Sequence, residues 1–165
     1  MALNTGLRRS EILNLKWQDI NFTERFLTVR ETKSKKNRHV PMNQQTFDVL
    51  HAIFRHTPGD YAFPGDKPGS HLSESYVTHC FGKTVKKAGV KDFHLHDLRH
   101  TFASWLVMSG VGLKTVQELL GHRTYQMTLK YAHLSLEHRQ SAIDILARRT
   151  GKLGAKRIER GTNLA

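Results

Sequence analysis

The sequence has little cysteine and no long apolar run, and each shortage excludes one kind of protein. Cys80 is the one cysteine among 165 residues, so no disulfide can form within the chain, and we interpret it as a small residue of the core. No apolar run approaches the roughly 18 residues that a membrane span needs, and the start MALNTGLRRS lacks the apolar core of a signal peptide. We therefore expect a cytoplasmic protein.

Acidic residues are also scarce, and this shortage indicates the kind of partner. The chain has 14 Asp and Glu against 26 Lys and Arg, which gives a formal net charge of +12 at pH 7. Such an excess favours a polyanionic partner, with nucleic acid ahead of an anionic membrane surface. A chain of 165 residues is long enough for one domain with its own core.

The spacing of apolar residues predicts an α+β fold that is mainly helical. Residues 26–32 and 38–42 read as two strands around the polar turn KSKKN, a small antiparallel β-hairpin near the N-terminus. Residues 1–150 are expected to form one domain, followed by a basic, flexible tail over 151–165. Helical spacing occurs in seven segments: 8–17, 43–56, 73–89, 98–110, 113–121, 124–133 and 136–149.

The stretch FHLHDLRHTFASWL, residues 93–106, places histidines and an arginine at the start of a helix that then becomes apolar. His96 and Arg99 are three residues apart, which puts both on one helix face. The pair suits a phosphate, because a guanidinium grips two oxygens and an imidazole moves a proton near neutral pH. A plainer alternative is helix capping with a surface ion pair. The predicted inward stripe of this helix is Leu98, Phe102, Trp105 and Leu106.

A metal site is the competing interpretation of the same stretch. His96 and His100 are four residues apart, and HDLRH superficially matches the zinc pattern H-E-x-x-H. However, Asp97 replaces the longer Glu of that pattern, and Arg99 would place a fixed positive charge beside a dication. A zinc-dependent hydrolase with a distant third ligand is therefore the weaker alternative.

Five motifs that follow one another in order carry a resemblance to a known family. They are TGLRRSE, TKSKKNRHVP, HDLRHTFAS, LGHRT and TLKYAH. Together they resemble the tyrosine recombinases, or phage-type integrases, from Thr5 to about Leu136. The resemblance implies a helical catalytic domain that cleaves and rejoins double-stranded DNA during site-specific recombination.

The resemblance also implies roles for matching residues. Glu11, three residues after Arg8, is expected to orient the Arg8 guanidinium, although a first-turn acid favoured by the helix dipole is the plainer account. His94, His100 and Tyr125 are interpreted as structural or supporting residues. The implied catalytic residues are the first arginine Arg8, the hairpin lysine Lys33, the H-x-x-R pair His96 and Arg99, the late histidine His122 and the nucleophile Tyr131.

In the implied reaction, the Tyr131 oxygen attacks a phosphodiester and leaves a covalent 3′-phosphotyrosine and a free 5′-hydroxyl. Cationic Arg8, Arg99 and His122 meet the developing negative charge, so no metal or other cofactor is expected. We expect His96 to accept the phenol proton and Lys33 to protonate the leaving 5′-oxygen. The predicted DNA-binding residues of the hairpin are Lys35, Lys36 and Arg38.

The resemblance further implies parts that this sequence does not contain. Family members carry an N-terminal helical domain and more helices before the first arginine, whereas Arg8 is the eighth residue here. We therefore expect an N-terminally truncated catalytic domain, which in the full-length protein would assemble as a tetramer on DNA. Because site choice depends on the missing parts, a DNA-binding remnant without turnover is a further alternative.

Overall fold

A three-stranded antiparallel sheet lies in the N-terminal half of the chain, and one of its faces is buried. The computed structural model describes residues 1–30, 37–135, 143–144 and 146–148. The strands β1 (Ile20–Asn21), β2 (Phe26–Arg30) and β3 (Asn37–Pro41) lie in the order β1-β2-β3. Leu27 and Val29 of β2 are buried together with Val40, the partner of Leu27 on β3. The alternation along each strand therefore turns one face of the sheet into a core.

Helix α3 (Gln44–Phe54) packs against this first core. The Asn43 side chain caps α3 by accepting a hydrogen bond from the Thr46 backbone N–H at 2.9 Å. Leu50 of α3 is fully buried with the strand residues. The 3₁₀ helix η1 (Trp17–Asp19) leads into the sheet, and the Trp17 ring meets the Phe54 ring edge-on at 5.0 Å.

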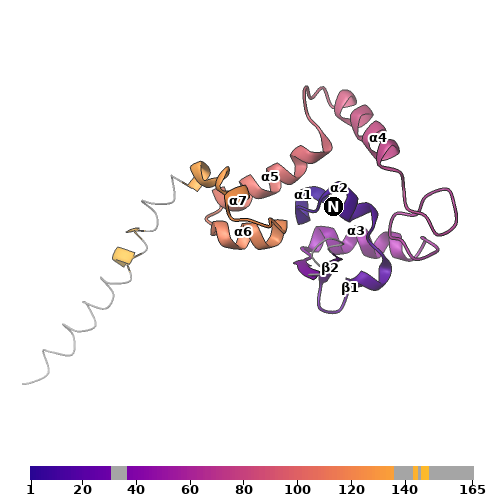
Figure 1. Cartoon of the computed structure of the whole chain (residues 1–165), viewed down its shortest axis with the longest axis horizontal. Coiled ribbons are helices and arrows are strands. Elements are labelled where there is room, and N and C mark those ends of the chain that lie inside the picture. The colour runs from indigo at the N-terminus through magenta and orange to yellow at the C-terminus, as the bar shows by residue number, and fades with distance from the viewer. Residues whose placement is uncertain (31–36, 136–142, 145, 149–165) are drawn as a thin grey trace, which may run out of the picture.

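Two short helices at the N-terminus join the sheet to the helical half. Gly6, between α1 (Ala2–Thr5) and α2 (Arg9–Leu13), has a φ of +63°, which favours glycine. A Cβ at Gly6 would lie 2.4 Å from Cδ1 of Phe102, so the missing side chain also permits close packing on α5 (Leu95–Met108). Figure 1 shows α1 lying beside α5, between that helix and α3.

A second core forms where α5 meets the helices that follow it. α6 (Leu113–Leu120), α7 (Gln126–Leu129) and the 3₁₀ helix η2 (Ala132–Ser135) gather beside one end of α5 in Figure 1. Gly121 ends α6 in the left-handed conformation, with φ +63°. The buried residues of this core are Ala103, Val107, Val116, Leu120 and Tyr131.

Helix α4 (Glu74–Lys87) projects away from both cores (Figure 1). All 14 of its residues are described, and none is buried. Its first turns contact α2 through Arg9, whose guanidinium pairs with Glu74 and donates to Thr78 Oγ1 at 2.7 Å. Cys80 lies on this helix and is half-exposed, so its prediction as a core residue is wrong.

The predicted fold class is confirmed, while two details of the sequence analysis differ. The buried stripe of α5 runs through Arg99, Ala103 and Val107, whereas Trp105 is 55 % exposed and its prediction as an inward residue is wrong. The predicted helix over 124–133 is two pieces, α7 and η2. The turn lysines, most of 136–149 and the tail 151–165 lie outside the described residues. Within the described part of the chain, no helix is long and apolar enough to span a membrane.

Candidate active site

Three arginines from three elements meet at the C-terminal end of α6. Arg38 Nε of β3 donates to the Leu119 carbonyl at 3.3 Å, Arg99 Nη2 of α5 donates to Leu120 at 2.7 Å, and Arg8 Nη2 donates to Gly121 at 3.3 Å. The last carbonyls of a helix lack partners within the helix and carry the negative end of its dipole. The C-terminal end of α6 therefore binds guanidinium groups favourably.

Arg99 is the most deeply held of the three. It is 3 % exposed, and its Nη1 donates to the Gly6 carbonyl at 2.6 Å. Burial, and after it the positive charge of Arg8, lowers the pKa of Arg99 to about 10, while the Glu11 carboxylate opposes the shift. The guanidinium stays charged at pH 7, and two backbone carbonyls fix its orientation in advance.

The Glu11 carboxylate lies among the same three guanidinium groups. Its Oε1 accepts from Arg8 Nη1 at 2.7 Å, and its Oε2 lies 3.9 Å from Arg99 Nη1. Arg38 reaches both carboxylate oxygens, at 3.0 and 2.8 Å. Burial raises the pKa of Glu11, but the Arg38 and Arg8 contacts outweigh it, and the pKa falls below its ordinary value. Glu11 is thus ionised and placed to orient Arg8.

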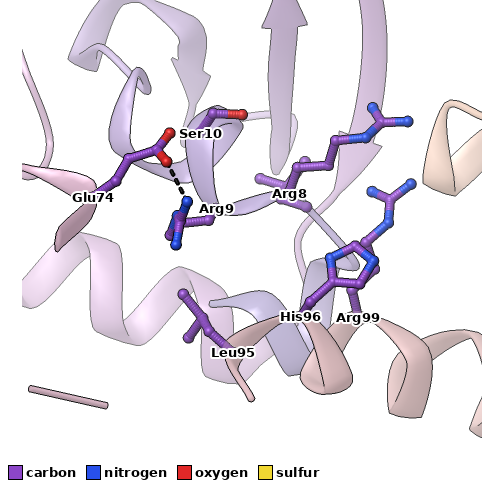
Figure 2. Close-up of a pocket in the computed structure, with 8 residues that line it drawn as sticks. Arg8, Arg9, Ser10, Glu74, Leu95, His96 and Arg99 are labelled. Atoms are coloured by element: carbon purple, nitrogen blue, oxygen red, sulfur yellow. Dashed lines mark hydrogen bonds and ion pairs between the residues drawn. The ribbon is translucent and has the colours of Figure 1, made fainter. Parts of the chain in front are cut away.

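Figure 2 shows the cavity that this cluster opens onto. Arg8, His96 and Arg99 lie together on one side, while Arg9 pairs with Glu74 on the other. Burial and the charge of Arg99 lower the pKa of His96, which is therefore neutral at pH 7. The cavity measures about 330 Å³ and is lined by Leu7, Arg8, Arg9, Ser10, Glu74, Leu95, His96 and Arg99.

Tyr131 is held beside this cluster by a histidine to which we gave only a supporting role. Tyr131 is 5 % exposed, and its hydroxyl lies 2.6 Å from Nδ1 of His100. Burial raises the pKa of Tyr131, while the charge of Arg99 opposes the rise. His100 follows Arg99 in the sequence and faces the ring of His96 at 4.7 Å. The sequence signal for its position was the four-residue spacing from His96, which we weighed only as a zinc pattern.

His122 follows the glycine that ends α6. Its Nδ1 lies 2.9 Å from Oγ1 of the buried Thr128. Burial and then the positive charges of Arg99 and Arg8 together lower the pKa of His122 to about 4. We expected a cation here, but at pH 7 the free chain presents a neutral imidazole that can still donate one hydrogen bond.

The remaining predicted residues are not gathered in the cavity. Lys33, Lys35 and Lys36 lie outside the described residues. His94 is the N-cap residue that precedes α5, with its backbone N–H donating to Asp97 Oδ2 at 2.6 Å, and Tyr125 is exposed. Arg38 was predicted to contact DNA, yet the structure turns its guanidinium inward onto Glu11 and α6.

The zinc alternative lacks a third ligand in the part of the chain that the structure describes. No group of three or more His, Cys, Asp or Glu side chains there is arranged to hold a metal ion. Nδ1 of His100, one of the two proposed ligands, is already within hydrogen-bond distance of the Tyr131 hydroxyl.

The comparison with known proteins decides the family. The model of the phage integrase family matches residues 1–138. The chain belongs to this family. The integrase of Salmonella phage P22 is 32 % identical over 177 residues, covering 98 % of this chain and 46 % of the relative. Tyrosine recombinase XerA of Pyrococcus furiosus is 36 % identical over 148 residues, covering 87 % and 51 %.

A solved transposon integrase shares the fold. The Tn1549 transposon integrase, in complex with circular intermediate DNA, superposes with a TM-score of 0.74 at 25 % identity, over 88 % of this chain and 57 % of that one. This chain thus spans about half the length of the curated relatives that it matches. The five sequence motifs therefore identified the family correctly.

Proposed function

We propose that this chain is the catalytic domain of a site-specific recombinase, which cleaves and rejoins DNA through a covalent 3′-phosphotyrosine. One observation carries the proposal: Arg8, His96 and Arg99 line a single cavity in a chain of the phage integrase family. Two guanidinium groups and an imidazole that converge from different elements match the oxygens of one phosphodiester. DNA as the substrate is supported by the integrase of similar fold that was solved with DNA.

The arginines would stabilise the charge of the transition state. As the Tyr131 oxygen bonds to phosphorus, negative charge builds on the two non-bridging oxygens. Arg99 can meet this charge without reorienting, because the Gly6 and Leu120 carbonyls already hold it. Arg8 is more exposed and reaches the cavity from the start of α2, where Glu11 holds it. A bound phosphate would also raise the pKa of His122 and favour its protonated form.

Proton transfer requires an acceptor at Tyr131 and a donor at the leaving oxygen. The geometry favours His100 as acceptor over His96, our expectation from the resemblance, because His100 Nδ1 lies 2.6 Å from the hydroxyl. With the proton of neutral His100 on Nε2, Nδ1 is free to accept from the phenol. Lys33 as the donor to the 5′-oxygen stays a prediction.

A covalent-trapping experiment tests the proposal. The DNA would be a pool of biotinylated duplexes with random sequence around a nick, so that the short 5′-hydroxyl fragment is lost after cleavage and the adduct accumulates. We expect the wild-type chain to form adducts that survive denaturation, with the nucleotide on Tyr131 by peptide mass spectrometry. Tyr131→Phe should form none, whereas the exposed control Tyr125→Phe should match the wild type.

The outcomes separate the alternatives. DNA binding without any adduct would favour the DNA-binding remnant. Cleavage that stops in EDTA and returns with Zn²⁺ would favour the hydrolase. An adduct that persists in Tyr131→Phe would remove Tyr131 as the nucleophile. A tetramer of the full-length protein on DNA, and a cytoplasmic location, follow from the same proposal and stay predictions.

A further inference from the structure

The guanidinium of Arg38 is enclosed by protein groups, whereas an arginine that contacts DNA must present its guanidinium at the surface. Only 13 % of its side-chain surface is exposed. Its Nη1 and Nη2 donate to the two oxygens of Glu11 at 3.0 and 2.8 Å, the bidentate geometry that a guanidinium makes best. Its Nε donates to the Leu119 carbonyl at 3.3 Å. All three nitrogens of the group therefore point into the protein.

The glycine at the end of α6 makes room for this guanidinium. A Cβ on Gly121 would lie 2.6 Å from Arg38 Nη1 and 2.7 Å from its Cζ. Gly121 is thus required twice, once for its positive φ and once because Arg38 packs against its backbone. The Gly121 carbonyl in turn accepts from Arg8 Nη2.

Arg38 therefore touches both groups that hold Arg8. Glu11 accepts from Arg8 on one side, and the Gly121 backbone accepts from it on the other. Loss of Arg38 would leave Glu11 without its two-point contact and leave a space beside Gly121. Both partners of Arg8 could then shift, although Arg38 itself does not line the cavity.

We propose that Arg38 is a positioning residue that fixes Arg8 for phosphate binding by holding Glu11 and the end of α6. The inference rests on the proposed recombinase function. Lysine cannot replace it fully, because an ammonium group lacks the planar fork that spans both Glu11 oxygens. A phosphate contact by Arg38, our expectation from the sequence, is the competing role.

The first test separates positioning from DNA contact. Arg38→Met and Arg38→Lys would be compared in single-turnover adduct formation at saturating nicked duplex, with binding measured by fluorescence anisotropy over a salt series. We expect Arg38→Met to slow adduct formation about 100-fold, as small misplacements of a catalytic group do, and Arg38→Lys to fall between it and the wild type. The affinity for DNA and the salt slope should stay unchanged.

A matched control and a double-variant cycle make the test specific. Arg30→Met removes another strand arginine paired with a carboxylate, Asp19, outside the cavity, and should leave adduct formation unchanged. Because Arg38 acts through Arg8, adding Arg38→Met to Arg8→Lys should slow the reaction by no more than about 2-fold. The positioning role would be overturned if the slowing in the double variant equalled the product of the two single slowings. A weaker DNA affinity with a flatter salt slope in Arg38→Met would overturn it as well.

A readout without catalysis keeps the inference separate from the proposed function. The Nε–H signals of Arg8 and Arg99 in ¹H–¹⁵N NMR report whether each guanidinium is held. We expect Arg38→Lys and Gly121→Ala, which crowds the Arg38 group, to shift and broaden the Arg8 signal while the Arg99 signal persists. If the wild type forms no adduct, the recombinase proposal fails, yet this signal still decides the role of Arg38. An unchanged Arg8 signal in both variants would overturn it.

Discussion

The Tyr131 hydroxyl lies 2.6 Å from Nδ1 of His100, the residue next to the buried Arg99. One turn of α5 thus presents both the arginine that we propose binds phosphate and the partner of the proposed nucleophile. A phenol is a weak nucleophile at neutral pH, and burial raises the pKa of Tyr131 further. In the proposed reaction, removal of the Tyr131 proton must therefore accompany attack on phosphorus.

If His100 takes that proton, a variant that removes the His100 imidazole and leaves a space for it should be rescued by an external base. We expect His100→Gly to slow adduct formation by at least about 100-fold, and imidazole added to the buffer to restore part of the rate. His96→Gly should also be slow, but without rescue of the proton-transfer step. The measurement is single-turnover adduct formation at several imidazole concentrations. Equal rescue of both variants would argue against a specific role for His100.

Glu11 should contribute far more to stability than a surface acid in a similar ion pair. Its carboxylate is 12 % exposed among three guanidinium groups, so Glu11→Gln should lower the free energy of unfolding by about 3 kcal/mol. Glu74→Gln, in the exposed pair with Arg9, should cost less than about 1 kcal/mol. Urea unfolding of both variants measures the difference, and equal losses would contradict our account of Glu11.

The lowered pKa of His122 predicts a stability that falls on acidification. The unfolded chain binds a proton on this imidazole near pH 6.5, but the folded chain binds it only near pH 4. The contribution of neutral His122 to the free energy of unfolding is complete above pH 6.5 and is lost as the pH falls towards 4. His96 and His100, whose pKa values are also lowered, act in the same direction. His122→Gln should reduce the decline in urea midpoint between pH 7 and 5; an unchanged decline would place its source elsewhere.

Two glycine variants separate packing from backbone strain. Gly6→Ala meets both a left-handed φ and the Phe102 ring, so it should destabilise the chain by at least about 2 kcal/mol. Gly89→Ala has a similar φ of +70° but open space around it, and should cost about 1 kcal/mol. Thermal or urea unfolding distinguishes them. Equal losses would show that the contact with Phe102 adds nothing.

The parts of the site that lie close in sequence were predictable, because helical spacing fixes them. Glu11 falls three residues after Arg8, and their contact is the one expected for that spacing. Arg38 reaches the same carboxylate from 27 residues away and the Leu119 carbonyl from 81 residues away. Those contacts depend on how β3 packs against α6, which local patterns do not encode.

The wrong prediction for Trp105 has a physical origin in the buried arginine of the same helix. We placed Trp105 in the buried stripe of α5 because large apolar residues are usually inside. The buried stripe instead includes Arg99, whose charge is satisfied by two carbonyls and by the nearby Glu11 carboxylate. An arginine in the interior rotates the helix away from the orientation that apolar residues alone would give, and Trp105 then faces out.

The two carbonyls that hold Arg99 also limit when the site can exist during synthesis. Gly6 is synthesised 93 residues before Arg99, but Leu120 is synthesised 21 residues after it. A nascent chain arrested before Leu120 therefore contains both H-x-x-R residues, but only one of the two carbonyls that accept from the Arg99 guanidinium. We therefore expect the proposed phosphate site to be complete only after the end of α6 has been synthesised and has packed against Arg99.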